Sequence, residues 1–148
     1  MIVKEIRDED FTSYKRPSMV IGFPSCNWKC GKGLCQNSPL ATSPNINISI
    51  DSLIERYMNN PITKAVICAG LEPFDSYDDM VRLIKEFRMH TNDDIVIYTG
   101  YNKDEIIDKI NLIKNYNNII IKFGRYIPNQ KPHLDEVLGV NLASDNQY

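Results

Sequence analysis

Three of the four cysteines, Cys26, Cys30 and Cys35, fall within ten consecutive positions of the segment "PSCNWKCGKGLCQNS", residues 24–38. Cysteine thiolates are soft ligands that select zinc, copper(I) or iron–sulfur clusters. A structural zinc site usually takes four protein ligands, whereas this segment supplies three. Three thiolates suit a cubane of four irons and four sulfides in which one iron lacks a protein ligand, although most clusters use four cysteines. The spacing therefore indicates a metal site with one open position, where a cofactor or substrate can bind the metal directly.

Closed zinc coordination is the alternative, and its fourth ligand would have to be Cys68, His90 or His133. None of the three is paired with the cysteine segment by spacing. Cys68 is expected to be a small buried apolar residue, as free cysteines commonly are. We interpret both histidines as surface or core residues, so zinc binding remains the second hypothesis.

The composition predicts one globular domain, residues 1–148, in a reducing compartment. The chain is 43% hydrophobic and 24% charged, which is close to the average for globular proteins. A net charge of −2 gives no basic footprint for nucleic acid or an anionic membrane. The first residues, "MIVKEIRDEDF", are charged where a signal peptide would have its apolar region. No apolar run approaches the length needed to span a bilayer. We therefore expect a cytoplasmic protein, in which clustered cysteines bind metal rather than form disulfides.

Alternating apolar runs and helical stripes predict the elements that position this segment. Strands are predicted over residues 18–25, 64–70, 94–100 and 118–124, and helices over 48–60, 77–90 and 102–116. The first two helices have predicted apolar stripes, which are Ile50, Leu53, Ile54, Tyr57 and Met58 in one and Met80, Leu83, Ile84 and Phe87 in the other. The last 24 residues are expected to be irregular, with at most a short helix or turn. Strands that alternate with helices form parallel sheets with right-handed crossovers. The predicted fold class is α/β, an open, partial β/α barrel with about four to six mainly parallel strands.

The carboxyl ends of the predicted strands carry the unusual residues. The cysteine segment follows the first strand, and "CAGLEPF", "YTGY" and "KFGR" come at the ends of the next three. Ligands of parallel sheets bind at this edge, so we expect one site there. Lys122 and Arg125 could meet a carboxylate or a partner protein, but we interpret them as solvated charges.

The cysteine segment resembles the cluster loop of the radical S-adenosylmethionine superfamily. Three residues separate Cys26 from Cys30, as in the family. Four residues instead of two separate Cys30 from Cys35, a bulge that Gly31 and Gly33 can absorb. The "AGLEP" stretch, residues 69–73, is similar to the family's Gly-Gly-Glu-Pro segment, with Leu71 in place of the second glycine.

More specifically, the chain resembles a divergent subgroup of the activating proteins of anaerobic (class III) ribonucleotide reductases. Four stretches carry this resemblance in order: "CQNSPL", "IVIYTGYNKDEI", "IIIKFGRYI" and "LGVNLASDNQY". They include Asn37, Ser144, Asn146 and Gln147, which match the family. For the last two residues, lining the cofactor site and fastening the C-terminal segment remain open alternatives.

The resemblance implies the site residues and their roles. Cys26, Cys30 and Cys35 would ligate one [4Fe-4S] cluster, and Gly70, Leu71 and Glu72 would hold the amino acid end of S-adenosylmethionine. The other cofactor-binding candidates are Leu34, Gln36, Asn37, Tyr98 and Asn146, although Tyr98 could be an ordinary aromatic strand residue.

The resemblance also implies the reaction and the partners. The implied activity is formation of a 5′-deoxyadenosyl radical that generates a glycyl radical on the reductase's catalytic subunit. Flavodoxin or ferredoxin would donate the electron. Activity on another glycyl-radical enzyme or on a peptide is the alternative within this chemistry.

Overall fold

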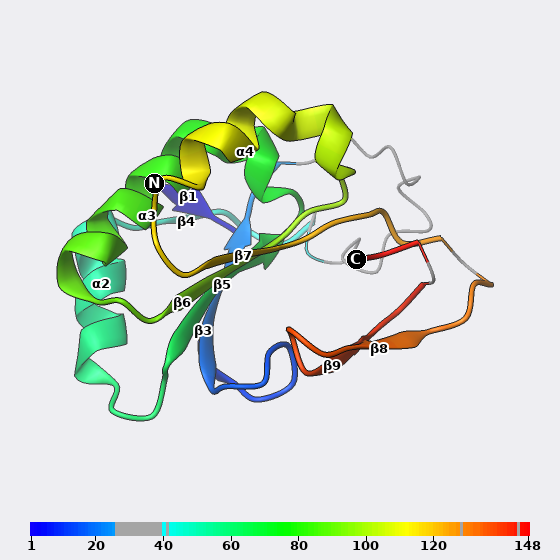
Figure 1. Ribbon diagram of the computed structural model, residues 1–148. Coiled ribbons are helices and arrows are strands. Elements are labelled where there is room, and N and C mark those ends of the chain that lie inside the picture. Colours follow the sequence, from blue (N-terminus) through cyan, green and yellow to red (C-terminus); the bar gives the residue numbers. More distant parts are fainter. Residues whose placement is uncertain (26–39, 41, 128, 145) are drawn as a thin grey trace.

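A five-stranded sheet forms the centre of the fold (Figure 1). The computed structural model describes residues 1–25, 40, 42–127, 129–144 and 146–148. The strand order is β2-β3-β5-β6-β7; β2 pairs antiparallel with β3, and the remaining neighbours pair in parallel. These strands span Glu5–Asp10 (β2), Ser18–Phe23 (β3), Ala65–Gly70 (β5), Asp94–Tyr98 (β6) and Ile119–Lys122 (β7). An α/β fold with four to six mainly parallel strands is confirmed, and each of the four predicted strands is present.

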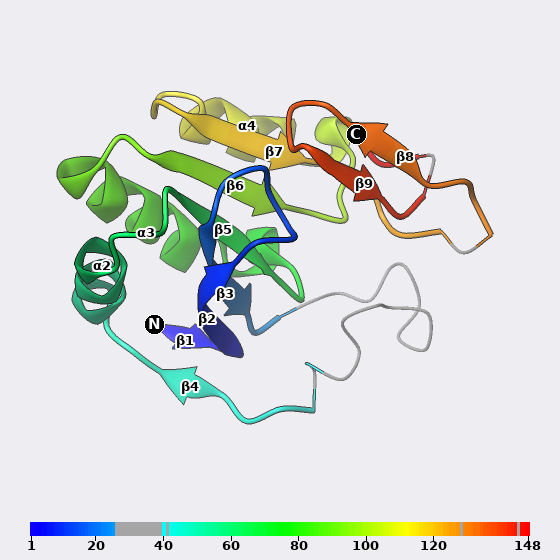
Figure 2. The same ribbon diagram turned by 90° about the horizontal axis from the view of Figure 1, so that it is seen from below.

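The helices cover one face of this sheet (Figures 1 and 2). They are α2 (Ile50–Asn59), α3 (Tyr77–His90) and α4 (Ile107–Ile113), and short 3₁₀ turns, η2 (Pro73–Ser76) and η3 (Lys103–Ile106), precede α3 and α4. Successive parallel strands lie side by side in chain order, so each crossover moves in the same direction. Right-handed crossovers that all move one way place their helices on one face. All three predicted helices are confirmed, the third one as η3 followed by α4.

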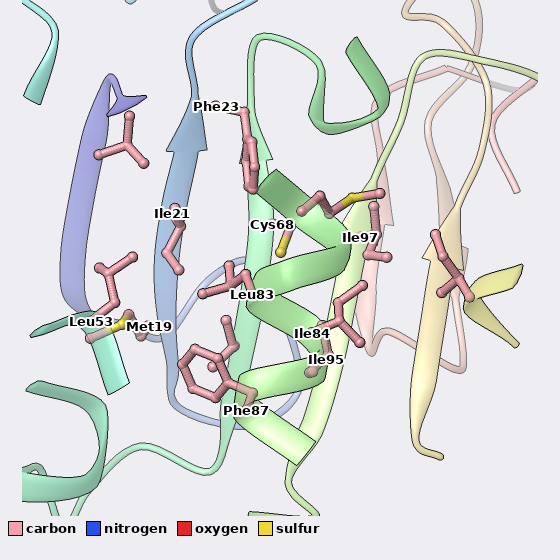
Figure 3. Close-up of a cluster of buried hydrophobic side chains, with 14 of the residues drawn as sticks. Met19, Ile21, Phe23, Leu53, Cys68, Leu83, Ile84, Phe87, Ile95 and Ile97 are labelled. Atoms are coloured by element: carbon pink, nitrogen blue, oxygen red, sulfur yellow. The ribbon is translucent and has the colours of Figure 1, made fainter. Parts of the chain in front are cut away.

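The main core lies between the helices and the sheet. Figure 3 shows Met19, Ile21 and Phe23 of β3 on this side, together with Cys68 of β5. The predicted apolar stripe of α3 is buried in full: Met80, Leu83, Ile84 and Phe87 are each at most 1% exposed. Met58, expected on the apolar stripe of α2, is instead 49% exposed. The stripe of α2 is therefore narrower than its sequence predicts.

A β-hairpin packs on the opposite face of the sheet. The prediction that the C-terminal segment is irregular was therefore wrong. Strands β8 (His133–Asp135) and β9 (Val140–Leu142) pair antiparallel. Leu138 and Leu142 join a second buried cluster with Val20 and Ile67. Strands of three residues are too short to show the alternation that identifies a strand in sequence, so packing against the sheet decided this structure.

The N-terminal residues also form strands that the sequence did not predict. Strand β1 (Ile2–Val3) pairs with β4 (Ile46–Asn47), and β2 forms an edge of the main sheet. Five of the six residues of β2 are charged. Charged residues are unfavourable in a central strand but common on edge strands, so their pattern did not indicate a strand.

Two glycines bring the ends of β3 and β5 into close contact. Gly70 has a φ of +91°, and a Cβ atom there would lie 2.4 Å from the backbone nitrogen of Phe23 and 2.6 Å from the Cα atom of Gly22. The Leu71 N–H donates to the Phe23 carbonyl at 3.1 Å just beyond. Both the backbone conformation and the available space therefore require glycine at position 70.

We expect Gly70→Ala to destabilise the fold by at least about 2 kcal/mol, because it combines an unfavourable positive φ with a backbone clash. Gly100→Ala is the matched control, since a Cβ there would have its nearest contact at 3.4 Å. Urea unfolding followed by circular dichroism measures both. Equal effects of the two substitutions would contradict the steric argument.

Candidate functional site

The carboxyl ends of the parallel strands meet at one edge of the sheet, as the sequence predicts. β3 ends at Phe23, and Cys26, the first cysteine of the segment, comes three residues later in the chain. β5 leads into Leu71 and Glu72, and β6 leads into Thr99 and Gly100. We call Glu72, Thr99, Gly100 and Lys122 the carboxyl-edge site.

The described residues that follow the cysteine segment lie near β3, the strand that precedes it. A Cβ atom added to Gly22 would lie 3.5 Å from the Cδ2 atom of Leu40, so Leu40 packs beside this strand. Ser43 donates its N–H to the Leu40 carbonyl at 3.2 Å, and Lys4 Nζ donates to the Ser43 carbonyl at 2.6 Å. The chain therefore leaves β3 and returns to it next to the carboxyl-edge site.

Six of the predicted site residues lie outside the described residues. They are Cys26, Cys30, Cys35, Leu34, Gln36 and Asn37. Their roles remain predictions. The described candidates are Gly70, Leu71, Glu72, Tyr98 and Asn146, and the structure places all of them at or next to the carboxyl ends of β5, β6 and β7.

Glu72 is a buried carboxylate that joins two strand ends. It is 4% exposed. Its Oε1 accepts hydrogen bonds from the Phe74 N–H at 3.1 Å and the Thr99 hydroxyl at 2.8 Å, and its Oε2 accepts one from the Gly100 N–H at 2.8 Å. Burial raises its pKa above the usual value, and the three hydrogen bonds oppose that increase. A carboxylate can accept about four hydrogen bonds, so Oε2 retains capacity for one more donor.

Lys122 is buried beside this carboxylate, which corrects its interpretation as a solvated charge. It is 7% exposed, and its Nζ donates to the Gly124 carbonyl at 3.1 Å and lies 5.7 Å from the centre of the Tyr98 ring. Burial lowers its pKa to about 8, while the charge of Glu72 opposes the decrease. The sequence shows only that a lysine follows three isoleucines at the end of a predicted strand. It could not show that the lysine side chain is buried.

Arg125 meets a carboxylate at the outer rim of the same edge. Its guanidinium lies 3.0 Å from Glu105 and 5.5 Å from the centre of the Tyr101 ring. The Tyr101 hydroxyl donates to Asp75 at 2.6 Å. The rim thus contains Tyr101 and Arg125, and tyrosine and arginine are enriched in protein interfaces.

Tyr98 lies on the hairpin side of the sheet, where its hydroxyl donates to the Ser13 carbonyl. Burial raises its pKa to about 12. Its side chain therefore packs next to Lys122 on the hairpin side of the carboxyl-edge site. Whether it also contacts a cofactor stays a prediction.

Asn146 and Gln147 fasten the C-terminal segment to the end of β7. Asn146 donates to the Arg125 carbonyl at 2.7 Å and accepts from the Ser144 hydroxyl at 2.7 Å. Gln147 donates to the Gly124 carbonyl at 3.4 Å. These contacts give the two residues the fastening role that the sequence left open, and cofactor contact by Asn146 stays a prediction.

The candidates for a fourth protein ligand are spread over the fold. Cys68 is fully buried in the helix-side core, where burial raises its pKa to about 12, so a thiolate is strongly disfavoured there. His90 ends the 14-residue helix α3, about 21 Å from the edge where that helix begins. His133 lies on β8, with a buried Nδ1 that has no hydrogen-bond partner among the described residues. No three His, Cys, Asp or Glu side chains in the described part of the chain are grouped to hold a metal ion.

Comparison with protein families identifies the chemistry of the metal site. Residues 18–145 match the family model described as a 4Fe-4S single cluster domain. The chain belongs to this family. It is therefore an iron–sulfur protein, and the donor set agrees because thiolates are the ligands that hold such clusters.

Two other comparisons gave no match. Neither a curated protein nor a solved structure is significantly similar to the chain. No helix in the described part of this 4Fe-4S domain is long and apolar enough to cross a bilayer.

We expect the 4Fe-4S domain to retain its cluster when Cys68 is replaced, because this thiol is enclosed in the core. After anaerobic reconstitution, Cys68→Ala and His133→Ala should keep the wild-type iron and sulfide content, and Cys35→Ala should lose most of it. Iron and sulfide analysis with the visible absorption spectrum measures this. Loss of iron from Cys68→Ala or His133→Ala in a protein that still folds would show a closed, four-ligand site.

We also expect alkaline pH to favour the native state through Lys122. Its folded-state pKa of about 8 is below the ordinary value of 10.5, so the unfolded chain binds more protons between these values. Stability should therefore rise with pH, by about 2 kcal/mol between pH 7 and 9.5 relative to Lys122→Met. Urea unfolding of both proteins at several pH values measures the difference, and a constant difference would contradict a buried ammonium.

Proposed function

We propose that the protein is a radical S-adenosylmethionine activating enzyme that generates a glycyl radical on an anaerobic ribonucleoside-triphosphate reductase. The observation that carries the proposal is the set of three clustered cysteines in a chain of the 4Fe-4S single cluster family. A cubane held by three thiolates leaves one iron without a protein ligand. This is the position at which a sulfonium cofactor would bind through its amino and carboxylate groups.

The carboxyl-edge site supports a cofactor next to that iron. Glu72 lies one residue beyond Leu71, whose N–H bonds to the end of β3, the strand that leads into the cysteine segment. Its Oε2 oxygen has capacity for one additional donor, and an N–H of the methionyl amine that would bind the iron is such a donor. Gly70 and Leu71 would present backbone groups to the same end of the cofactor.

The sheet is suited to binding this cofactor because it corresponds to part of the wall of an open β/α barrel. Its parallel strands follow one another in chain order, and the helices α2, α3 and α4 lie on one face, which is the arrangement of a β/α barrel segment. The inner face carries the hairpin, and the cofactor would lie at the carboxyl edge. In this proposal the strands are a partial barrel of the radical S-adenosylmethionine type.

When bound and reduced by one electron, the cluster would supply reductive cleavage of S-adenosylmethionine to methionine and a 5′-deoxyadenosyl radical, which removes a hydrogen atom from a glycine of the partner. The residues of this chain place and shield the reactants. Glu72 would orient the amino end of the cofactor, and Thr99 and Gly100 hold that carboxylate in place. The nearby positive charge of Lys122 would favour the ionised form of the Glu72 carboxylate.

A partner polypeptide and an electron donor complete the proposed reaction. The rim of Tyr101, Arg125 and Glu105 offers aromatic and charged side chains to a protein loop that enters from the carboxyl edge. The donor would be flavodoxin or ferredoxin. A net charge of −2 gives no support for a nucleic acid partner.

The reconstituted, reduced protein should cleave S-adenosylmethionine to 5′-deoxyadenosine and methionine. With the catalytic subunit of an anaerobic ribonucleotide reductase it should then produce a glycyl radical doublet in electron spin resonance. Chromatography of the products measures the cleavage, and the electron spin resonance spectra measure the glycyl radical. Cleavage with a doublet only on another glycyl-radical enzyme would favour the alternative partner, and a loaded cluster without any cleavage would refute the radical chemistry.

Glu72→Gln and Cys68→Ala form a matched pair for this experiment. Glu72→Gln removes the charged acceptor for the N–H of the methionyl amine, so the apparent KM for S-adenosylmethionine should rise at least tenfold while the iron content is unchanged. Cys68→Ala should leave the KM unchanged, because that side chain is enclosed in the core. An unchanged KM in Glu72→Gln would remove Glu72 from the cofactor site.

A further inference from the structure

The ammonium of Lys122 is buried with most of its hydrogen-bonding capacity unused. Lys122 is 7% exposed, and a lysine ammonium carries three N–H donors. One of them bonds to the Gly124 carbonyl at 3.1 Å, and the other two bond to no described residue. No carboxylate in the described part of the chain forms an ion pair with it. Because a buried charge is unfavourable unless it is paired, Nζ is suited to binding an anionic group of a ligand.

The Glu72 carboxylate brings the opposite charge into the same buried region. It is 4% exposed, and among the described residues its Oε2 accepts only the Gly100 N–H. The charge of Glu72 acts on Lys122, since it opposes the decrease in the lysine's pKa. The two side chains nevertheless form no ion pair with each other. A ligand can therefore bridge them by donating to Oε2 and accepting from Nζ.

The two opposite charges restrict the class of this ligand. Glu72 would repel a phosphate or another simple anion, and Lys122 would repel an alkylammonium ion. An amine and a carboxylate carried by one carbon atom match both side chains, because an N–H of the amine donates to Glu72 and the carboxylate accepts from Lys122. Hydrogen bonds between charged groups are the strong ones. The pair of side chains thus favours the amino acid end of a ligand.

Contacts on two sides hold the Lys122 side chain in place. The Gly124 carbonyl that accepts its N–H also accepts from the side-chain amide of Gln147 at 3.4 Å. The ring of Tyr98 has its centre 5.7 Å from Nζ, and the Tyr98 hydroxyl donates to the Ser13 carbonyl. A side chain that is fixed in this way loses little conformational freedom when it binds a ligand. Lys122 is therefore preorganised for recognition.

We propose that Lys122 binds the carboxylate of an α-amino acid group whose amine is held by Glu72, and that it selects cofactors carrying this carboxylate. The inference deepens the proposed function and rests on it for the identity of the cofactor, S-adenosylmethionine. It adds a specificity-determining residue on β7 to the candidates at the ends of β5 and β6. Recognition of the carboxylate requires no radical chemistry, so binding alone can measure it.

Binding of S-adenosylhomocysteine and of its decarboxylated form to the anaerobically reconstituted protein tests this role. Both ligands keep the amine and lack the sulfonium that is cleaved, but only the first has the carboxylate. The wild type should bind S-adenosylhomocysteine at least about tenfold more tightly, as expected for hydrogen bonds between charged groups. Lys122→Met should remove this preference by weakening S-adenosylhomocysteine alone. Isothermal titration calorimetry measures the four dissociation constants.

Lys109→Met is the matched control for this substitution. The Nζ of Lys109 likewise donates to a backbone carbonyl, that of Phe74 at 3.3 Å, and lies 5.2 Å from the centre of the Tyr77 ring. Its side chain is exposed on α4, outside the carboxyl-edge site, so the preference for the carboxylate should remain. Glu72→Gln should weaken both ligands to the same extent, because both carry the amine.

The inference is overturned by a wild type that binds neither ligand or binds both equally. It is also overturned if Lys122→Met keeps the preference, or if it weakens both ligands to the same extent and so shows a structural role only. These results are separate from the test of the proposed function. Cleavage of S-adenosylmethionine without the preference would refute only the role of Lys122, whereas the preference without any cleavage would refute only the radical chemistry.

Discussion

A single buried carboxylate holds the carboxyl edge of this sheet together. Glu72 accepts hydrogen bonds from Phe74, Thr99 and Gly100, and so joins the turn after β5 to the turn after β6. The positive charge of Lys122 on β7 lies in the same buried environment. Removing an ionised carboxylate from water is unfavourable unless hydrogen bonds and an opposite charge compensate for it. The site therefore depends on three strand ends being present together, and it cannot form from any one of them.

A close contact between two strands places the strand end that leads into the cysteine segment. The contact between Phe23 and Leu71 is possible because Gly22 and Gly70 lack side chains, and it sets the end of β3 next to Glu72. The cysteine segment of this 4Fe-4S domain leaves the sheet from that strand end and returns beside it at Leu40. The backbone of two glycines thus brings the strand end that leads into the cysteine segment and the buried carboxylate to one edge.

Sequence patterns predicted the parallel strands from continuous apolar runs and the helices from apolar residues repeated at helical spacing. The stripe of α3 is one example, and all four of its predicted core residues are buried. The same patterns missed β2, whose charged residues are tolerated only because it is an edge strand. They also missed the β8–β9 hairpin, whose strands are three residues each. In both cases the structure depends on which surface lies alongside, and that information is not local.

The sequence by itself indicated metal binding through clustered thiols, and its match to the 4Fe-4S single cluster family identified an iron–sulfur protein. It also determined the edge at which the site lies, since parallel strands end on the same side. Only the tertiary structure decided that Lys122 is buried beside Glu72, that Cys68 is enclosed in the core, and that Asn146 and Gln147 fasten the chain to β7. The reason is physical: burial and pairing depend on atoms that are far apart in the chain, and folding alone brings them together.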